Sequence, residues 1–488
     1  MNIKQYKLLC DACDQVINED KNLFRVSIPW LHVLREHPAS LRQYECLFNN
    51  NVNDDVLYSN NSLLVNRKRL NIFPLESHKI TKSNNSKDVD VVIVSHIVNV
   101  EHLDSNEDFY FGDIPQYLIN NRVNPLVVLI NHTNEKTESL SKKAVNSDLP
   151  RIILPKNLSL IEEMHNIFGL IREMLKIRLS SFREKGLLKQ TMQRASSAKG
   201  LGGALSSLRI NRQIKQILKL YNPKVIITTY EGHSWERVVY GVVNRHNDNI
   251  LRIAYQHSVI TKNAHSIFRS LGKKYDPDLI FTSGFITKNF FQKSPEKMHS
   301  RLEILGSKKS SVNISTHGQK KRQICLVLPE GIIDECITLF NFSIKCANFL
   351  PHIDFIWRLH PVISFKEVLR CMGINSDDLP KNIVLSSSSL SEDIIKSNFA
   401  LYRGTTAIIE AIYGGLMPIY LADDSGMTID LLFEIDDGKA VVRNVNEFSM
   451  IIKDNSPFDN DKLVKYCESY FTQIDYSALL NELKRAIW

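Results

Sequence analysis

Short apolar runs alternate with longer amphipathic stretches through the first half of the chain. The runs 89–94 and 125–130 are rich in Val, Ile and Leu, and a helical pattern at 113–121 separates them. Strand, helix and strand at this spacing predict a βαβ unit with two parallel strands. Four more strands are expected, at 151–155, 224–230, 251–256 and 278–282. This half of the chain is therefore predicted to form a doubly wound parallel sheet.

Helical patterns fill the space before and between these strands. After the strand at 151–155, the pattern predicts a helix over 158–192, a Gly/Ser-rich break at 196–207 and a helix over 208–220. Residues 1–88 combine an amphipathic start with Asn-rich stretches. We expect them to form a small extension packed on the first domain.

A polar segment at 306–322 precedes a second series of alternating elements. Its strands are expected at 323–328, 354–359, 382–385, 399–402 and 417–421, with helices over 332–349, 389–397 and 405–413. Two such sheets, joined by a hinge, would face each other across a cleft lined by the carboxyl ends of their strands. The predicted parts are an extension at 1–88, a first domain at 89–315, a second domain at 316–460 and a C-terminal helix at 461–488 that packs back toward the cleft.

The composition fits two or three well-packed cores. The 488 residues are 43% apolar, and the formal net charge of +8 suits anionic partners such as nucleotides but is too small to imply nucleic acid. The N-terminus does not resemble a secretory signal, and no apolar run reaches the ~18 residues of a membrane span. We therefore expect a cytoplasmic protein whose contact with a membrane, if any, is peripheral. The eight scattered cysteines fit reduced, packed side chains.

Two residues suited to a phosphate group follow one strand of the second domain. Arg358 and His360 come directly after the strand residues 354–357, where a parallel sheet presents its loops. A guanidinium supplies a planar fork of donors, and a protonated imidazole would help a nucleotide phosphate to leave. A histidine bound to nearby backbone is the alternative interpretation of His360.

A second phosphate-binding element is expected after the strand at 399–402. Gly404 lets the backbone approach a ligand closely, while Thr405 and Thr406 begin a helix whose free N–H groups favour an anion. Glu410 lies one turn further along, where a carboxylate can accept hydrogen bonds from ribose hydroxyls. An ordinary capped helix with a solvated glutamate is the alternative.

Two more loops carry weaker candidates at strand ends. Glu330 and Gly331 precede a helix and would approach the base or the phosphate. Gln256, His257 and Ser258 form a polar cluster in the first domain. His257 is a candidate for binding the carboxylate of a sugar or the acceptor, and a structural histidine is the alternative.

The acid that we expect to carry chemistry is Glu231, which directly follows the strand at 224–230. Facing the cleft, its carboxylate would take a proton from an acceptor hydroxyl or attack an anomeric carbon directly. His233, two residues on, would tune this carboxylate. An acid that merely caps the following helix is the alternative interpretation.

The net positive charge is concentrated between residues 172 and 224. Thirteen Lys and Arg residues stand there against two acids, Glu173 and Glu184. With apolar residues at helical spacing beside them, they indicate either contact with an anionic membrane or glycolipid, or a solvated face of a core helix. No Asp-x-Asp clamp accompanies the candidate site, so no metal ion is predicted.

Residues 220–425 resemble bacterial capsule and lipopolysaccharide glycosyltransferases that use CMP-activated sugars, including polysialyltransferases and β-Kdo transferases. Glu231-Gly232, His360-Pro361 and Thr405-Thr406 are similar to the acidic, His-Pro and hydroxyl-bearing motifs of these families, although polysialyltransferases carry a Ser pair in the third. Gln256-His257 is similar to the Gln-His element of capsule Kdo transferases.

The resemblance implies a GT-B fold, meaning two Rossmann-like domains that face each other, and a reaction without a cofactor. It further implies transfer of an acidic ulosonic sugar, of Kdo or sialic/pseudaminic type, from its CMP donor to a surface-polysaccharide or lipid-linked acceptor. Two other functions stay open. Glycerophosphotransferases that use CDP-glycerol have a similar Arg-x-His-Pro strand end, but Tyr402–Thr406 lacks the Asp of their hydroxyl-rich turn. A GT-B-shaped subunit without catalytic activity is the other alternative.

Overall fold

The computed structural model describes residues 1–34, 41–48, 80, 88–144, 149–294, 298–310, 323–360, 363–423, 427–454 and 460–488. The predicted domain boundary at 315–316, residue Pro361 and most of the segment 49–87 lie outside these residues.

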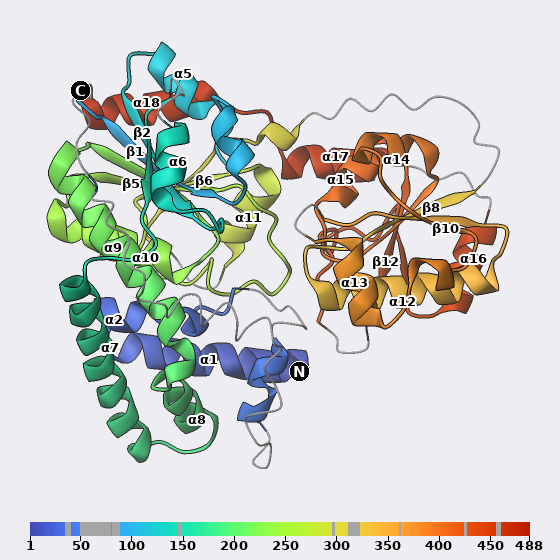
Figure 1. Cartoon of the computed structure of the whole chain (residues 1–488), viewed down its shortest axis with the longest axis horizontal. Coiled ribbons are helices and arrows are strands. Elements are labelled where there is room, and N and C mark those ends of the chain that lie inside the picture. Colours follow the sequence, from blue (N-terminus) through green and yellow to red (C-terminus); the bar gives the residue numbers. More distant parts are fainter. Residues whose placement is uncertain are drawn as a thin grey trace.

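Seven parallel strands form the sheet of the first domain, in the order β3-β2-β1-β4-β5-β6-β7 (Figure 1). They are β1 (Val91–Ile97), β2 (Pro125–Asn131), β3 (Arg151–Leu154), β4 (Val225–Thr229), β5 (Leu251–Gln256), β6 (Leu279–Thr282) and β7 (Arg301–Ile304). Because β1 pairs with both β2 and β4, the strand order reverses between β1 and β4. The crevice at such a switch point is the usual ligand site of this topology.

Helices cover both faces of this sheet because alternate strand residues point to opposite sides. Val91 and Ile93 belong to the core under α5 (Ile114–Asn120), α6 (Thr137–Ala144) and the last helix, α18 (Tyr476–Ile487). Val92 and Val94 face α9 (Leu201–Tyr221) and α10 (Ser234–His246), and α11 (Phe285–Lys293) continues this layer. The predicted doubly wound sheet is confirmed.

Part of the Gly/Ser-rich segment is helical, so the predicted break at 196–207 is wrong from residue 201 onward. Gly202, Gly203 and Ala204 lie buried in the first turn of α9. The hydroxyl oxygens of Ser207 and Ser234 lie 3.0 Å apart between α9 and α10. The small side chains allow α9 and α10 to pack closely. Amino-acid composition alone does not distinguish such a helix contact from a loop.

The extension packs on the helical region of the first domain. Its described elements are α1 (Ile3–Glu19), α2 (Leu23–Val26), η1 (Pro29–Leu31) and η2 (Arg42–Leu47). Their apolar residues share a core with α7 (Leu160–Ser180), α8 (Gly186–Ala195) and α10. Figure 1 shows α1, α2, α7 and α8 together below the first sheet.

Six parallel strands form the second sheet, in the order β10-β9-β8-β11-β12-β13. They are β8 (Ile324–Leu328), β9 (Asp354–Trp357), β10 (Ile383–Leu385), β11 (Phe399–Tyr402), β12 (Met417–Leu421) and β13 (Ala440–Val442). One face packs under α12 (Ile333–Phe349), α13 (Phe365–Met372) and α16 (Val445–Lys453). The other packs under α14 (Leu390–Lys396), α15 (Ala407–Tyr413) and α17 (Asp461–Tyr470). The strand order reverses between β8 and β11, and the two-domain GT-B architecture is confirmed.

The C-terminal segment belongs to both domains. Two helices replace the single predicted helix: α17 packs on α15 of the second domain and on α11 of the first, and α18 then covers the first sheet. The chain therefore returns to the domain in which it began (Figure 1).

Candidate active site

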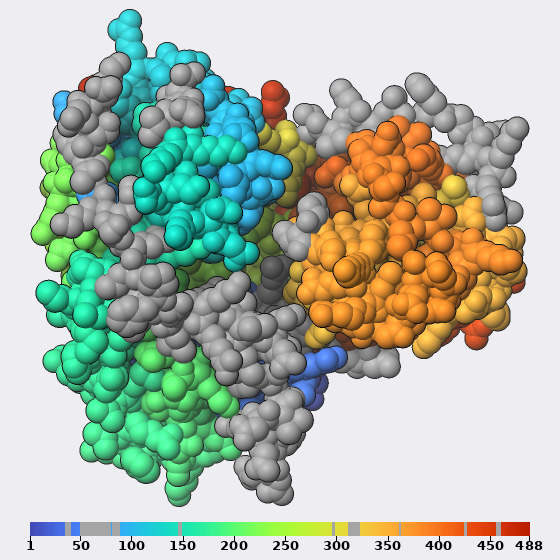
Figure 2. All heavy atoms as spheres, in the orientation of Figure 1, coloured from blue at the N-terminus to red at the C-terminus, as the bar shows by residue number. Residues whose placement is uncertain are grey.

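A cavity of about 730 Å³ opens between the two domains. In Figure 2 the domains meet along a furrow. Residues that follow β4 and β5 line the cavity from the first domain, and residues that follow β8, β9 and β11 line it from the second. Residues 307–309, which follow the last strand of the first sheet, also contribute. The switch points of both sheets thus open into one space.

Most of the predicted site residues line this cavity. They are Glu231, His233, His257, Ser258, Glu330, Gly331, His360, Gly404, Thr405 and Thr406. Glu231 and His360 come from different domains, and the fold brings them to the same cavity across 129 positions of sequence. Arg358, Gln256 and Glu410 are not among the lining residues.

The backbone around Glu231 is fixed by Glu236, in the first turn of α10. The Glu236 carboxylate accepts hydrogen bonds from the backbone N–H groups of Glu231 (2.8 Å), Gly232 (2.9 Å) and His233 (2.8 Å). Gly232 has a φ of 85°, and a Cβ there would lie 2.5 Å from the backbone nitrogen of Ile267. These contacts fix the course of the loop backbone. Sequence analysis did not single out Glu236, although its position three residues after the N-cap residue His233 is that of a capping box.

The Glu231 carboxylate lies among hydrogen-bond donors. Its side chain keeps 38% of its exposure, and its Oε2 lies 3.2 Å from His233 Nε2. Burial by itself raises the pKa of Glu231, but the hydrogen bond from His233, the nearby His257 and the hydrogen bond from Ser258 together hold that pKa well below its ordinary value. The group is therefore ionised at neutral pH.

Aromatic and imidazole rings extend the wall beside Glu231. Tyr110 lines the cavity with its ring edge-on to His257 and to His96, at centroid distances of 5.0 and 5.4 Å. His96, at the end of β1, has its Nδ1 2.9 Å from His132 Nε2. Burial lowers the pKa of both His257 and His96, so both rings are neutral at pH 7. Sequence analysis missed Tyr110 and His96, although the strand-end position of His96 could have revealed it.

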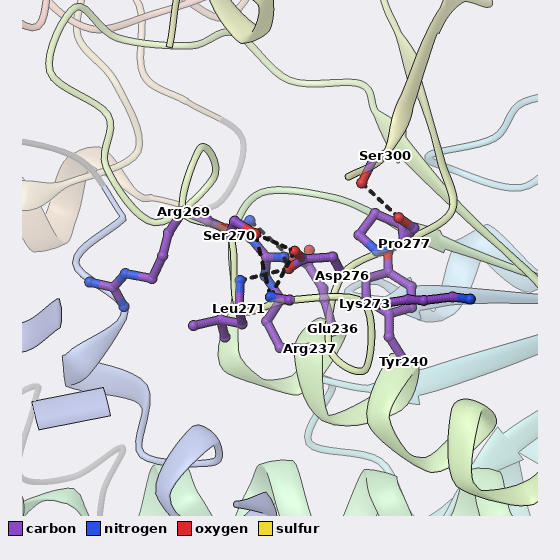
Figure 3. Close-up of polar contacts among 12 residues, drawn as sticks. Glu236, Arg237, Tyr240, Arg269, Ser270, Leu271, Lys273, Asp276, Pro277 and Ser300 are labelled. Atoms are coloured by element: carbon purple, nitrogen blue, oxygen red, sulfur yellow. Dashed lines mark hydrogen bonds and ion pairs between the residues drawn. The ribbon is translucent and has the colours of Figure 1, made fainter. Parts of the chain in front are cut away.

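A buried ion pair holds the segment 260–276 against α10 (Figure 3). Arg237 donates from Nη1 to Asp276 Oδ1 (2.6 Å) and from Nη2 to the carbonyl oxygen of Arg269 (2.7 Å). The Ser270 hydroxyl donates to the other oxygen of Asp276 (2.7 Å). Because residues 260–264 and 267 line the cavity in part, this network shapes the first-domain wall.

The N-terminal extension supports the same wall from outside. The Tyr6 hydroxyl donates to the carbonyl oxygen of Asn263 (2.9 Å), and Asp14 Oδ2 lies 2.8 Å from His265 Nε2. Asp14 also pairs with Arg269. Residues far outside the predicted first domain thus position the lining segment.

In the second domain, Arg403 fixes the loop that follows β11. Its Nε donates to Glu335 Oε2 (2.6 Å) and its Nη1 to the carbonyl oxygen of Leu421 (2.7 Å). Gly404, with a φ of 61°, approaches the Glu330 carboxylate so closely that a Cβ there would lie 2.9 Å from Glu330 Oε1. The loops after β8 and β11 therefore meet at the switch point of the second sheet, and there Gly404 and Glu330 line the cavity.

Two nitrogen bases of the cavity are weakened by their surroundings. Burial lowers the pKa of His360, and the nearby Lys309 lowers it further, against a rise caused by Glu330. Burial likewise lowers the pKa of Lys309, against rises caused by Glu410 and Glu231. Lys309 follows the last strand of the first sheet and interacts electrostatically with an acid of each domain, Glu231 and Glu410. Nothing in its local sequence marks it, and only the fold reveals it.

Arg358 binds groups that do not line the cavity. Its Nη1 donates to Asp393 Oδ2 (2.8 Å), to the carbonyl oxygen of Ser388 (2.6 Å) and to the Ser386 hydroxyl (3.3 Å). β9 lies between β8 and β10, one strand away from the switch point, so the loop after β10 receives the guanidinium. The buried Asp393 carboxylate needs this cation.

Gln256 and Glu410 also have other partners. Gln256 is fully buried and its amide donates to the carbonyl oxygen of Ser258, so it shapes the loop that carries His257. Glu410 is half-buried on α15; burial raises its pKa, and Lys309 and Arg358 lower it. Direct binding of a ligand by Arg358, Gln256 or Glu410 stays a prediction.

Within the described ranges, no group of three or more His, Cys, Asp or Glu side chains is arranged to hold a metal ion. No helix in the described part of the chain is both long and apolar enough to cross a bilayer.

No protein-family model matches the chain, and no curated protein matches its sequence. Similarity to solved structures is low. UDP-GlcNAc 2-epimerase from Methanocaldococcus jannaschii is 11% identical, with a TM-score of 0.47 covering 81% of this chain and 100% of that one. The glycosyltransferase of kitacinnamycin is 10% identical (TM-score 0.40; 82% and 95% covered), and SnogD from Streptomyces nogalater is 9% identical (TM-score 0.42; 81% and 100% covered). The topology and the cavity define the class: a GT-B-type protein with a cavity between facing switch points.

Proposed function

We propose that the chain is a cytoplasmic glycosyltransferase that moves an acidic ulosonic sugar, of Kdo or sialic/pseudaminic type, from its CMP-activated donor to a surface-polysaccharide or lipid-linked acceptor. One observation carries the proposal: the Glu231 carboxylate from one domain and His360, Gly404 and Thr405 from the other line a single cavity of about 730 Å³. A cavity of this size accommodates a nucleotide and a monosaccharide together.

In this proposal the cytidylate lies against the second domain. Gly404 lies close to Glu330 and has no side chain, so its backbone lines the cavity. The hydroxyl groups of Thr405 and Thr406 add polar groups beside it. Lys309 supplies a cation for the phosphate. His360 is neutral in the free site. A phosphate dianion beside it would raise the pKa of His360, so that the imidazole takes up a proton next to the leaving phosphate.

Glu231 acts on the other side of the sugar. Its depressed pKa keeps the carboxylate ionised, as attack on an anomeric carbon requires. Service as a general base for the acceptor hydroxyl is equally compatible with its position in the cavity. The anomeric configuration of the product distinguishes the two routes, because double displacement retains it and direct displacement inverts it.

The donor is identified by incubating the purified full chain with CMP-Kdo, a CMP-sialic acid, CDP-glycerol and UDP-GlcNAc in turn. We expect that only a CMP-sugar is hydrolysed and that CMP raises the melting temperature, since a ligand that binds only the folded state stabilises it. Turnover of CDP-glycerol alone would establish a glycerophosphotransferase instead. Absence of turnover and of stabilisation with every donor would favour the non-catalytic subunit.

A further inference from the structure

The outer face of α7 carries a continuous apolar stripe. Its members are Ile161, Met164, Phe168, Ile171, Leu175 and Leu179, all exposed. Spacings of three and four residues place them on one side of the helix. Ile161, Phe168 and Leu179 are 83%, 63% and 67% exposed. Phe182, in the turn that follows, adds a further exposed ring. An exposed apolar surface of this extent marks an interaction site.

The opposite face of α7 is fastened to the protein, so the stripe cannot turn inward. Glu163 is buried and accepts from Arg209 Nε at 2.6 Å. Ten residues further along, Glu173 is buried and accepts from Arg25 Nε at 2.8 Å. Separating either pair would leave a buried charge without its partner, which costs several kcal/mol. The orientation of α7 is therefore built into the fold.

Cations border the stripe. Arg172, Lys176, Arg178, Arg183 and Lys185 are exposed on α7 and in the segment that follows it. The acids Glu163 and Glu173 are on the buried face, and only the half-buried Glu162 and Glu184 accompany the cations outside. Figure 1 shows α7 along the edge of the first domain that lies away from the second domain. Most of the exposed cations in the segment 172–224 therefore lie beside this stripe, where a partner could contact them.

We propose that α7 lies in the plane of an anionic phospholipid bilayer, with the stripe in the boundary between headgroups and acyl chains and the flanking cations at the lipid phosphates. An amphipathic helix with apolar side chains on one face and Lys and Arg at its borders binds such a surface in two ways. It buries apolar area among the lipids, and its cations are attracted to the anionic headgroups. A second copy of the chain fits less well, because two such helices side by side would bring like charges together with few acids to offset them. The inference depends on the surface alone and holds for any donor sugar.

The test is co-flotation of the full chain with vesicles of phosphatidylglycerol and phosphatidylcholine in equal parts, and with vesicles of phosphatidylcholine alone. We expect binding to the anionic vesicles that weakens as salt is raised. The triple variant Phe168→Ser, Leu175→Ser, Leu179→Ser should lower the partition coefficient more than about tenfold. The double variant Arg172→Gln, Arg178→Gln should weaken binding to the anionic vesicles only. A matched control, Phe349→Ser with Met450→Ser, removes exposed apolar groups from the second domain and should bind as the wild type does.

All of these side chains are exposed, so unchanged melting temperatures would show that the variants fold. Failure of the wild-type chain to float with anionic vesicles would overturn the proposal. So would equal binding by the triple variant and the wild type. Sedimentation of the wild type as a dimer that the triple variant dissociates, without vesicle binding, would assign the stripe to a second copy instead.

Discussion

At the scale of single residues, Glu231 is the group on which the proposed chemistry depends. Glu231→Gln keeps the size and the hydrogen-bonding reach of the side chain but removes its charge. We expect glycosyl transfer to fall by roughly 10²–10⁴-fold. Binding of CMP, which the proposal places on the second domain, should change little, as isothermal calorimetry can measure.

The control for this variant is Glu101→Gln, which alters an exposed glutamate of the first domain outside the cavity. Equal activity of Glu231→Gln and the wild type would remove the carboxylate from the mechanism.

Lys309 tests the electrostatics of the same cavity. Lys309→Met keeps most of the apolar stem and removes the ammonium group that stands near Glu410 and Glu231. We expect the affinity for CMP to fall by about tenfold, because one charge-assisted contact with the phosphate is lost. The salt dependence of CMP binding should also flatten. Lys308→Met alters the neighbouring cavity lysine, which pairs with Glu107 (2.7 Å), and should have a smaller effect.

His360 makes donor binding sensitive to pH. Its pKa is lowered in the free protein, so the ring is neutral at pH 7, and a phosphate dianion would raise that pKa. Binding of CMP should therefore take up a proton near neutral pH, and affinity should decrease as pH rises through the pKa of the bound state. Calorimetry in buffers with different ionisation enthalpies measures the uptake. His360→Gln should abolish it, and an unchanged uptake in that variant would assign the proton to another group.

At the scale of elements, the start of α10 holds the loop that carries Glu231 in place. One carboxylate, Glu236, accepts from three successive backbone N–H groups. Glu236→Gln replaces one acceptor oxygen by a donor that faces a backbone donor, which should cost about 1–3 kcal/mol of stability. We expect a lower melting temperature and a larger fall in kcat than in CMP affinity, since the displaced residue is Glu231.

A comparable but exposed arrangement provides the control. Glu447 accepts from the backbone N–H of Arg443 (2.7 Å) at the start of α16, on the protein surface. Glu447→Gln should change neither activity nor melting temperature appreciably. Equal effects of the two substitutions would reduce Glu236 to an ordinary helix cap.

Elements also show where sequence patterns mislead. The alternation of apolar runs located most of the strands that build the two sheets, because a buried parallel strand is a continuous apolar segment. The edge strands β7 and β13 were missed: β7 alternates exposed and half-buried residues, and β13 has three residues of which the middle one is exposed. The start of α9 has the composition of a loop, yet its small residues are buried in a helix contact. Amino-acid composition predicts only the intrinsic propensity of a segment for helix, and tertiary packing overrides that propensity.

At the scale of the whole molecule, Tyr470 couples the domains. It ends α17, and its hydroxyl accepts from the backbone N–H of Ile260 (2.7 Å) and donates to the carbonyl oxygen of the same residue (3.2 Å). Ile260 lines the cavity from the first domain. Tyr470→Phe would leave two buried backbone groups without this partner. We expect a loss of about 1–3 kcal/mol and a higher KM for the donor.

Tyr466, one turn earlier on α17, is the matched control. Its buried hydroxyl has no hydrogen-bond partner among the described residues. Tyr466→Phe should therefore leave stability and KM unchanged or slightly improved. If Tyr470→Phe behaves like this control, the domains are held by apolar contacts alone.

The sequence by itself determined the two parallel sheets and most residues at their carboxyl ends, because the period of apolar residues is local and a parallel sheet gathers its strand ends at one edge. Only the tertiary structure decided which strands flank the switch points. Strand order is set by contacts between segments far apart in the chain, so His360 reaches the cavity while Arg358, two residues earlier, turns to Asp393. The same long-range contacts bring Lys309 into the cavity and leave the apolar stripe of α7 outside, and no local pattern records either placement.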